Sequence, residues 1–261
     1  MIKRILKTAT LITLFFALHS ANCYAKEITW KTVDHIIDGD TFVTKDGSHV
    51  RLLGINTPEI GRGGKENQPF ANEARLKLNT LLFNKRVRLE FGERYKDRYN
   101  RLLAHVYMED GTWINRELIA LSLAHVYSFP DNRAHTNTLI ELENNVKLKK
   151  QGIWGLERWK TYKTDEEIPD SAIGKFNITE GTVHHTTNTK GKIYINFGSN
   201  WREDFTVEIR KKELDIFKQS GIDPSENYNG KKLQIRGVFK PVNGVLVTAT
   251  HPEQLTILSN F

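Results

Sequence analysis

The sequence is poor in sulfur, with one cysteine and two methionines among its 261 residues. A single cysteine, Cys23, cannot close a disulfide within the chain, and it cannot supply the several thiolates of a zinc site or a dithiol redox site. Disulfide-stapled scaffolds and thiol redox enzymes are therefore excluded. The fold has to be stabilised by its hydrophobic cores.

Long hydrophobic runs are absent except near the N-terminus. That segment reads "MIKRILKTATLITLFFALHSANCYAKE", with basic residues before an apolar run at about 9–18 and small residues up to Ala25. The pattern is typical of a secretory signal peptide at 1–25, and the run is shorter than the ~20 residues of a transmembrane helix. We therefore expect an exported protein, periplasmic or secreted. Cleavage would remove Cys23 and leave no stable membrane span.

Acidic residues are fewer than basic ones. The chain has 38 Lys+Arg and 31 Asp+Glu, and cleavage would lower the net charge from +7 to +4 because Lys3, Arg4 and Lys7 are lost without any acid. A mildly basic protein suits a polyanionic partner, although such a charge is equally typical of ordinary solubility. A hydrophobic content of 39% and an aromatic content of 10% are sufficient for packed cores and exclude a disordered chain.

The first half of the chain predicts a small barrel with helices on one side. Residues 28–53 alternate apolar and polar positions, as strands do, with turn signals at "DGD" and "KDG". Helical spacing follows in "PFANEARLKLNTLLFN", in "NRELIALSLAHV" and in a longer stretch that ends at Gly152. Strand patterns and a hairpin at Asp110-Gly111 lie between them. The length allows two modest domains, and the first is expected at 26–155.

The second half predicts another small β-barrel. Residues 156–174 are polar, contain Pro169 and are expected to form a linker. Residues 175–261 contain three strand patterns, a short helix and two further strand patterns, which is the element order of an OB barrel. Strands of this fold can present aromatic side chains to nucleic-acid bases, and Tyr194, Phe197 and Trp201 are the candidates. Fold alone does not assign a function to this unit.

Polar residues in the stretch "IIDGDTFVTKDGSHVRLLGINTPEIG" directly border apolar strand patterns. If these strands pair, the oxygen atoms of Asp40, Asn56 and Thr57 converge at one end of the barrel. Carboxylate, amide and backbone carbonyl oxygens are the ligands that calcium prefers. The alternative is that "DGDT" is an ordinary turn, and an isolated "DGD" is more often a turn than a metal site.

Two arginines and a glutamate would complete a site for phosphoryl transfer. Arg51 and Arg101 can place a planar, permanent positive charge beside phosphate oxygens that gain negative charge in the transition state. Glu59 can act as a base for an attacking water molecule or can orient that water. From composition and spacing alone, an exposed strand position is the more common role for an arginine such as Arg51.

Several separated motifs resemble one known family. "IDGDT", "RLLGINTPE" and "DRYNRLLAHVY", in this order and followed by a helix that ends in "IW", resemble the staphylococcal (micrococcal) nucleases, or thermonucleases, over about residues 28–155. The resemblance implies an α+β, mostly β fold, with an OB-like five-stranded barrel and three helices. It also implies a calcium-dependent hydrolase, an endonuclease that cleaves DNA and RNA and leaves 3′-phosphate ends.

The resemblance assigns roles to individual residues. It implies catalytic roles for Arg51, Glu59 and Arg101, calcium ligation by Asp40, Asn56 and Thr57, and substrate-phosphate contacts by Arg98 and Tyr99. Asn56 stands where the family usually has aspartate, so the site loses one negative charge and we expect weaker calcium binding. The segment "AHVYSFPDN" looks two residues shorter than its family counterpart, and Tyr127 and Phe129 both remain candidates for stacking on a nucleotide.

Two other functions remain open at this point. The first is a weakly active or inactive nuclease-like protein of the cell envelope that binds nucleic acid without efficient cleavage, because of Asn56. The second is an interaction protein of the envelope that uses its C-terminal barrel to bind a partner. The combination of Arg51, Glu59 and Arg101 favours the enzyme, because a pure binding protein has no need of a carboxylate beside phosphates. We expect a monomer.

Overall fold

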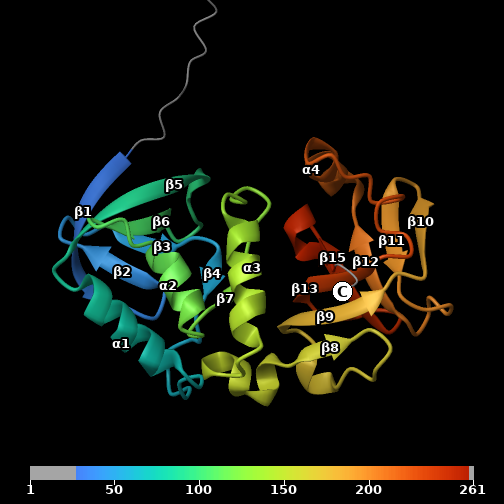
Figure 1. Cartoon of the computed structure of the whole chain (residues 1–261), viewed down its shortest axis with the longest axis horizontal. Coiled ribbons are helices and arrows are strands. Elements are labelled where there is room, and N and C mark those ends of the chain that lie inside the picture. Colours follow the sequence, from blue (N-terminus) through green and yellow to red (C-terminus); the bar gives the residue numbers. More distant parts are fainter. Residues whose placement is uncertain (1–27, 259–261) are drawn as a thin grey trace, which may run out of the picture.

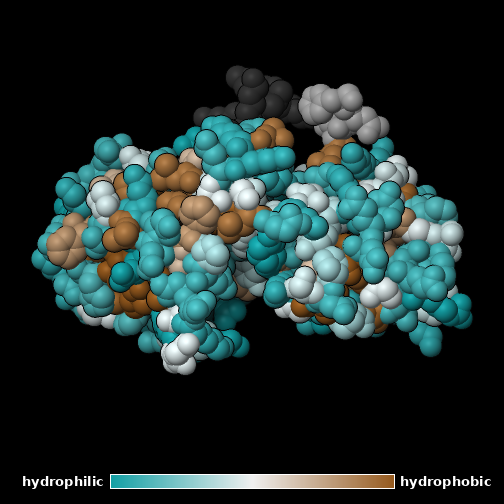
Figure 2. Space-filling view, turned by 90° about the horizontal axis from the view of Figure 1, so that it is seen from below, coloured by the Kyte–Doolittle hydropathy of each residue, from teal (hydrophilic) through white to brown (hydrophobic). Residues whose placement is uncertain are grey.

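The computed structural model describes residues 28–258, so the predicted signal peptide and Cys23 lie outside the described residues. These residues form two units, each with its own hydrophobic core, and helix α3 (Thr136–Lys147) lies between them (Figure 1). Figure 2 shows the two units as adjoining lobes with a largely hydrophilic surface and apolar patches on each. Within residues 28–258, no helix is long and apolar enough to cross a membrane.

The first unit is built on a closed five-stranded barrel, as predicted. Its strands are β1 (Ile28–Ile36), β2 (Thr41–Thr44), β3 (His49–Leu52), β5 (Arg86–Lys96) and β6 (Leu102–Met108), in the order β1-β2-β3-β6-β5. The β3–β6 pair is parallel and the other pairs are antiparallel. Alternate residues of β5, Val87, Leu89 and Phe91, point into the core, which is the period of two expected for a strand with one buried face.

Three helices accompany the barrel, also as predicted. They are α1 (Ala71–Leu82), α2 (Ile114–Ala120) and α3, and α1 buries Ala71, Ala74, Leu78 and Leu82 at helical spacing. Helix α3 ends at Lys147, earlier than the predicted end at Gly152. Gly152 has a φ of 54°, and a Cβ there would lie 2.2 Å from the carbonyl oxygen of Ser122. This close approach needs glycine at position 152, but the helix ends earlier, because Lys150 has a φ of 50° and already leaves the right-handed helical conformation.

A two-stranded ribbon adjoins the barrel. It consists of β4 (Ile55–Asn56) and β7 (His125–Val126), which pair in antiparallel register. The helical spacing of "NRELIALSLAHV" predicts that residues 125 and 126 end a helix, which is wrong. Helix α2 ends at Ala120, and these two residues pair with β4 instead. The ribbon brings a residue from the opening motif, Asn56, opposite His125.

The second unit has the element order of an OB barrel, divided between two sheets. One sheet runs β10 (His185–Thr189), β11 (Lys192–Asn196), β12 (Phe205–Ile209), β15 (Val245–Ala249), β14 (Lys240–Pro241); the other runs β16 (Leu255–Ile257), β13 (Lys232–Val238), β9 (Phe176–Thr182), β8 (Thr161–Lys163). Helix α4 (Leu214–Gln219) precedes β13. The antiparallel β10–β11–β12 meander, the parallel β12–β15 pair and the antiparallel β13–β9 pair repeat part of the connectivity of the first barrel. Among the described strands, the two sheets are not hydrogen-bonded into a closed barrel as β5 and β6 close the first one.

The segment 156–174 is more than the linker that the sequence suggested. It contributes strand β8, which pairs in parallel with β9. Tyr162 of β8 is buried in the second core, with its ring 5.8 Å from that of Phe239. The second unit therefore begins before residue 175, because an aromatic side chain within a polar stretch packs into its core.

A buried ion pair joins the two units. Arg236 of β13 donates a hydrogen bond from Nη2 to Glu143 Oε2 of α3 at 2.7 Å, and the two side chains are 1% and 0% exposed. Glu143 also accepts a hydrogen bond from the backbone N–H of Val126 at 2.6 Å. The Arg236 contact thus reaches the β4–β7 ribbon of the first unit through one carboxylate.

His251 is a second buried polar group at this junction. Its Nε2 lies 2.7 Å from Ser128 Oγ of the first unit. Burial lowers the pKa of His251 to about 4, with Arg133 and Arg236 acting in the same direction and Glu253 and Asp131 opposing them. The imidazole is therefore neutral in the folded protein near neutral pH.

We expect His251 to make the folded protein sensitive to acid. The unfolded chain binds a proton near pH 6.5 and the folded chain only near pH 4, so the stabilisation is complete above pH 6.5 and is lost as the pH falls toward 4. The full effect is about 3 kcal/mol, from about 1.4 kcal/mol per pKa unit. Urea unfolding of His251→Gln should show a shallower loss of stability between pH 6.5 and 4 than the natural protein; parallel curves would contradict this assignment.

Candidate active site

A cavity of about 520 Å³ opens at one end of the first barrel. The predicted site residues that line it are Asp40, Arg51, Asn56, Glu59, Arg98, Tyr99 and Arg101. Thr57 is not part of the lining, but its N–H and hydroxyl both donate hydrogen bonds to Asp40 Oδ2, at 2.9 and 3.1 Å. Segments that are about 50 residues apart in the sequence are thus brought to one hollow by the parallel pairing of β3 with β6.

Asp40 is the buried carboxylate of the site. Its Oδ2 lies 2.7 Å from Nη1 of Arg51 and accepts the two hydrogen bonds from Thr57. Burial raises the pKa of Asp40 to about 6; Arg51 opposes the rise, and the neighbouring carboxylate of Asp38 adds to it. A buried carboxylate beside a second one is a place where added positive charge is favourable.

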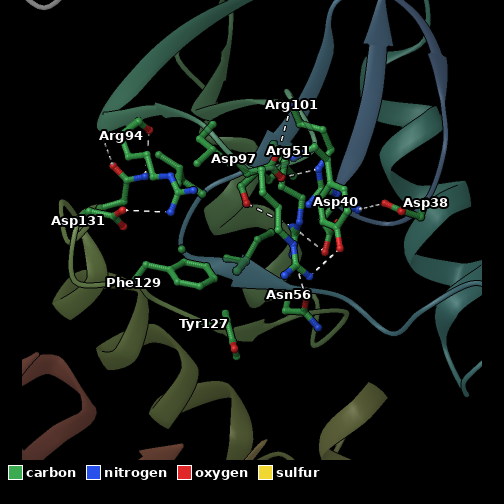
Figure 3. Close-up of a pocket in the computed structure, with 18 of the residues that line it drawn as sticks. Asp38, Asp40, Arg51, Asn56, Arg94, Asp97, Arg101, Tyr127, Phe129 and Asp131 are labelled. Atoms are coloured by element: carbon green, nitrogen blue, oxygen red, sulfur yellow. Dashed lines mark hydrogen bonds and ion pairs between the residues drawn. The ribbon is translucent and has the colours of Figure 1, made fainter. Parts of the chain in front are cut away.

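Arg51 bridges Asp40 and Asn56. Its Nη1 contacts the carboxylate, and its Nη2 donates to Asn56 Oδ1 at 2.8 Å. Nη1 also donates to the carbonyl oxygen of Leu52 at 3.3 Å. The guanidinium is therefore held at the cavity wall by several partners, in an orientation fixed before any substrate arrives. Figure 3 shows Arg51, Asp40 and Asn56 together on one side of the cavity.

Asn56 is oriented by a histidine that is distant in sequence. Its Nδ2 donates to the carbonyl oxygen of Thr57 at 3.1 Å and lies 3.5 Å from Nε2 of His125. Burial lowers the pKa of His125 to about 3, so its ring is neutral and Nε2 can accept a hydrogen bond. The ring stacks on Phe176, with centroids 4.9 Å apart. A neutral amide suits this neutral ring, which gives a physical reason for asparagine at position 56.

Arg101 enters the cavity from the start of β6. Its Nε donates to Asp97 Oδ2 at 2.7 Å, and its Nη1 lies 3.4 Å from Thr41 Oγ1, next to Asp40. Burial raises the pKa of Asp97, but the hydrogen bonds from Arg101 outweigh this and the net shift is downward. Asp97 therefore remains ionised and holds the second arginine in place.

The two predicted substrate residues lie on the same turn. Arg98 donates from Nη2 to the hydroxyl of Tyr99 at 2.6 Å, and its guanidinium lies 4.8 Å from the ring centre of Tyr99. Both side chains are exposed. They form a cationic and aromatic rim, which suits a phosphate and an adjoining base or sugar.

Glu59 lies on the loop that follows β4. Its backbone N–H donates to Gln68 Oε1 at 3.1 Å, and its carbonyl oxygen accepts from the N–H of Gln68 at 3.0 Å. The backbone of the loop is thus fixed, while the exposed carboxylate lines the cavity and can reach water. These are the properties needed in a general base.

Sequence reasoning missed several residues of the cavity. They are Asp38, Arg94, Asp97, Asp131 and Asn132. Asp38 carried a signal, since it stands two residues before Asp40 in "IIDGD". The Arg94–Asp131 pair, 3.3 Å apart, joins residues 37 positions apart and left no local pattern. Tyr127 and Phe129 both line the cavity, and Figure 3 places them below the Arg94–Asp131 pair.

The residues at Asp40 fit a hard divalent cation. Within residues 28–258 no group of three or more His, Cys, Asp and Glu side chains could hold a metal, so a metal here has to use neutral oxygens as well. Asp38 and Asp40 supply carboxylates, with the N–H of Asp40 donating to Asp38 Oδ1 at 3.2 Å. Asn56 lines the same cavity and Thr57 donates two hydrogen bonds to Asp40, so their carbonyl oxygens are the neutral candidates. This is the oxygen-only donor set that calcium prefers.

Comparison with known proteins identifies the family. A family model described as "Staphylococcal nuclease homologue" matches residues 49–155. The thermonuclease of Staphylococcus hyicus is 32% identical over 133 residues, which are 50% of this chain and 78% of that protein. The chain belongs to the staphylococcal nuclease family. The thermonuclease of Staphylococcus intermedius is 34% identical over 125 residues, 47% of this chain and 74% of that protein.

Membership of the staphylococcal nuclease family makes this chain a hydrolase of the nuclease class that acts on nucleic acid. A further relative, endonuclease YncB of Bacillus subtilis, is 34% identical over 149 residues, 55% of this chain and 69% of that protein. The family is generally dependent on Ca²⁺. The family model covers only the barrel unit, so the second unit needs its own explanation.

Proposed function

We propose that this nuclease is a calcium-dependent endonuclease that is exported, to the periplasm or the medium, and cleaves DNA and RNA to leave 3′-phosphate ends. The observation that carries the proposal is the convergence of Asp40, Arg51, Glu59 and Arg101 on one cavity. The oxygen-rich surroundings of Asp40 support calcium as the cofactor. The basic, then apolar, then small-residue pattern of residues 1–25 supports export.

Each charged group has a part in the proposed hydrolysis. Glu59 accepts a proton from the water that attacks phosphorus, the bond from phosphorus to the 5′-oxygen breaks, and that oxygen leaves as a hydroxyl after taking a proton from solvent. Arg51 and Arg101 donate hydrogen bonds to phosphate oxygens as these gain negative charge. A bound calcium ion would add positive charge beside the same oxygens. Arg98 and Tyr99 would hold the neighbouring phosphate.

The proposal is tested by incubating residues 26–261 with plasmid DNA and with RNA, in millimolar calcium and in EDTA. We expect cleavage of both only with calcium, and end-group analysis should find 3′-phosphates. Glu59→Gln should lose most of the cleavage and keep the same unfolding midpoint, because the side chain is exposed. Binding of nucleic acid with no cleavage at any calcium concentration would instead support a binding protein.

Asn56 offers a direct test of the metal site. We expect Asn56→Asp to lower the calcium concentration at half-maximal cleavage, because an added carboxylate raises the charge of the donor set. The substitution also places a negative charge near Nε2 of His125, 3.5 Å from the present amide, and should raise the pKa of that ring above about 3. Calcium titrations and NMR titration of His125 measure the two effects. An unchanged calcium midpoint would remove Asn56 from the metal site.

A further inference from the structure

The second unit carries a hollow of about 720 Å³ on the outer face of its five-stranded sheet. Tyr194 of β11 lies opposite Thr187 of β10 and Glu208 of β12, and Thr248 of β15 follows in the same row. These side chains all line the hollow, together with Trp201 from the loop between β11 and β12. In OB folds the outer face of the second and third strands is the usual ligand surface, and here these strands are β11 and β12.

This hollow is connected to the catalytic cavity through a third one. A hollow of about 350 Å³ at the junction of the two units shares Tyr127 and Phe129 with the catalytic cavity. The same hollow shares Lys240 and Thr248 with the sheet face of the second unit. The three hollows therefore follow one another from the active site, across the junction, to Trp201.

The path has the chemistry of a surface for single-stranded nucleic acid. Aromatic rings occur along it: Tyr99, Tyr127 and Phe129 at the cavity, then Tyr194 and Trp201 at the far end. Trp201 is 52% exposed, and the guanidinium of Arg202 lies 4.6 Å from its ring centre. Exposed rings beside a cation are the groups on which successive bases stack.

The charges along the path favour phosphate. Lys240 lines two of the hollows and donates a hydrogen bond to Thr248 Oγ1 at 2.9 Å, and within residues 28–258 it forms no ion pair. The acid that lines the hollow of the second unit is neutralised by a partner, since Glu208 lies 3.1 Å from Lys192. At the catalytic cavity, Asp131 lies 3.3 Å from Arg94. A phosphate chain therefore meets available positive charge with little opposing negative charge.

We propose that the second unit is an extension of the substrate site, which binds a single nucleic-acid strand that runs from the catalytic cavity past Phe129 and Lys240 to Tyr194 and Trp201. This rests on the proposed endonuclease function for the identity of the strand. Its consequence is a preference for long, single-stranded substrates over short ones, because only a long strand reaches Trp201.

Binding is measured first, in EDTA so that no cleavage occurs, with a fluorescent single-stranded DNA of 20 nucleotides. Trp201→Ala should raise the Kd about tenfold, the effect of losing one stacked base. The matched control is Trp30→Ala, since Trp30 is also exposed and has Arg86 5.0 Å from its ring centre, but lines none of the three hollows. Lys240→Ala should reduce the slope of log K against log salt by about 0.7. Lys231→Ala is the control and should not, because Lys231 is exposed but lines none of the three hollows.

Cleavage is measured second, with calcium, on the 20-nucleotide strand and on a dinucleotide. Trp201→Ala should raise KM for the long strand about tenfold and leave kcat and dinucleotide cleavage unchanged. Equal Kd values for Trp201→Ala and the natural protein would overturn the proposal, and so would equal losses on both substrates. The proposal would also be overturned if a neutral oligosaccharide quenched the fluorescence of Trp201 and the nucleic-acid strand did not. If the natural protein binds the strand but cleaves neither substrate, the proposed endonuclease function fails and the strand surface remains.

Discussion

Replacing Arg101 with alanine is expected to reduce kcat by about 10³-fold or more, which is the range for an arginine that stabilises the transition state of phosphoryl transfer. Arg101 is held by Asp97 at 2.7 Å and reaches Thr41 beside Asp40, so its charge is in position before the substrate binds. Alanine removes both the charge and the paired donors. KM should change much less than kcat, because the interaction strengthens as negative charge develops.

Two further variants make this result specific. Arg101→Lys should recover only part of the rate, because an ammonium group keeps the charge but lacks the planar fork. Arg116→Ala is the matched control, since Arg116 is a half-exposed arginine paired with Glu117 at 3.4 Å and does not line the cavity. Plasmid cleavage and thermal unfolding are measured for all three. A rate for Arg101→Ala within tenfold of the natural protein would show that Arg101 is not catalytic.

Replacing Arg236 with methionine is expected to destabilise the folded chain by about 3–5 kcal/mol, the usual effect of leaving one charge of a buried pair without its partner. Glu143 would remain fully buried, and its remaining hydrogen-bond donor among residues 28–258 would be the N–H of Val126 at 2.6 Å. The double variant Arg236→Met with Glu143→Gln removes both charges and should recover a large part of the loss. Urea unfolding of the single and double variants measures the coupling.

An exposed ion pair of the same unit gives the control for this prediction. Lys163 and Glu180 lie 2.9 Å apart near the surface, and Lys163→Met should change stability by less than about 1 kcal/mol. If Arg236→Met costs no more than Lys163→Met, the buried pair does not hold the units together. Because Val126 pairs with Ile55 in the β4–β7 ribbon, Arg236→Met should also raise the calcium concentration needed for cleavage.

Arg236 connects the catalytic cavity with the proposed strand surface of the second unit. Through Glu143 it contacts the ribbon that carries Asn56, and it also lines the hollow at the junction of the units. The second unit therefore supports the β4–β7 ribbon of the catalytic unit and adds the proposed strand surface to its substrate site. A nuclease barrel without residues 156–258 would lose the partner of Glu143, the stacking partner of His125 at Phe176 and the strand surface at Trp201.

Much of the barrel and of the site could be predicted from the sequence because the relevant signals are local. The alternating pattern of β5 and the helical spacing of α1 each follow from a few consecutive residues. Asp40, Arg51 and Glu59 stand within 20 positions, next to strands whose pairing follows from their order in an OB barrel. The predicted end of α3 was wrong because the chain leaves the right-handed helical conformation at Lys150, where φ is 50°, and a lysine gives no sequence signal for that conformation.

The sequence by itself determined the barrel, its family and the residues proposed for catalysis, because periodicity and closely spaced motifs act over short stretches of chain. Only the tertiary structure decided how Asn56 is used, since the amide faces a neutral histidine 69 positions away. The tertiary structure also decided that Arg236 pairs with Glu143, which is 93 positions away in the sequence. It placed the three hollows next to one another along one path. Such contacts depend on how two folded units pack together. The free energy that orients these side chains comes from burial at that junction, and no short stretch of sequence contains it.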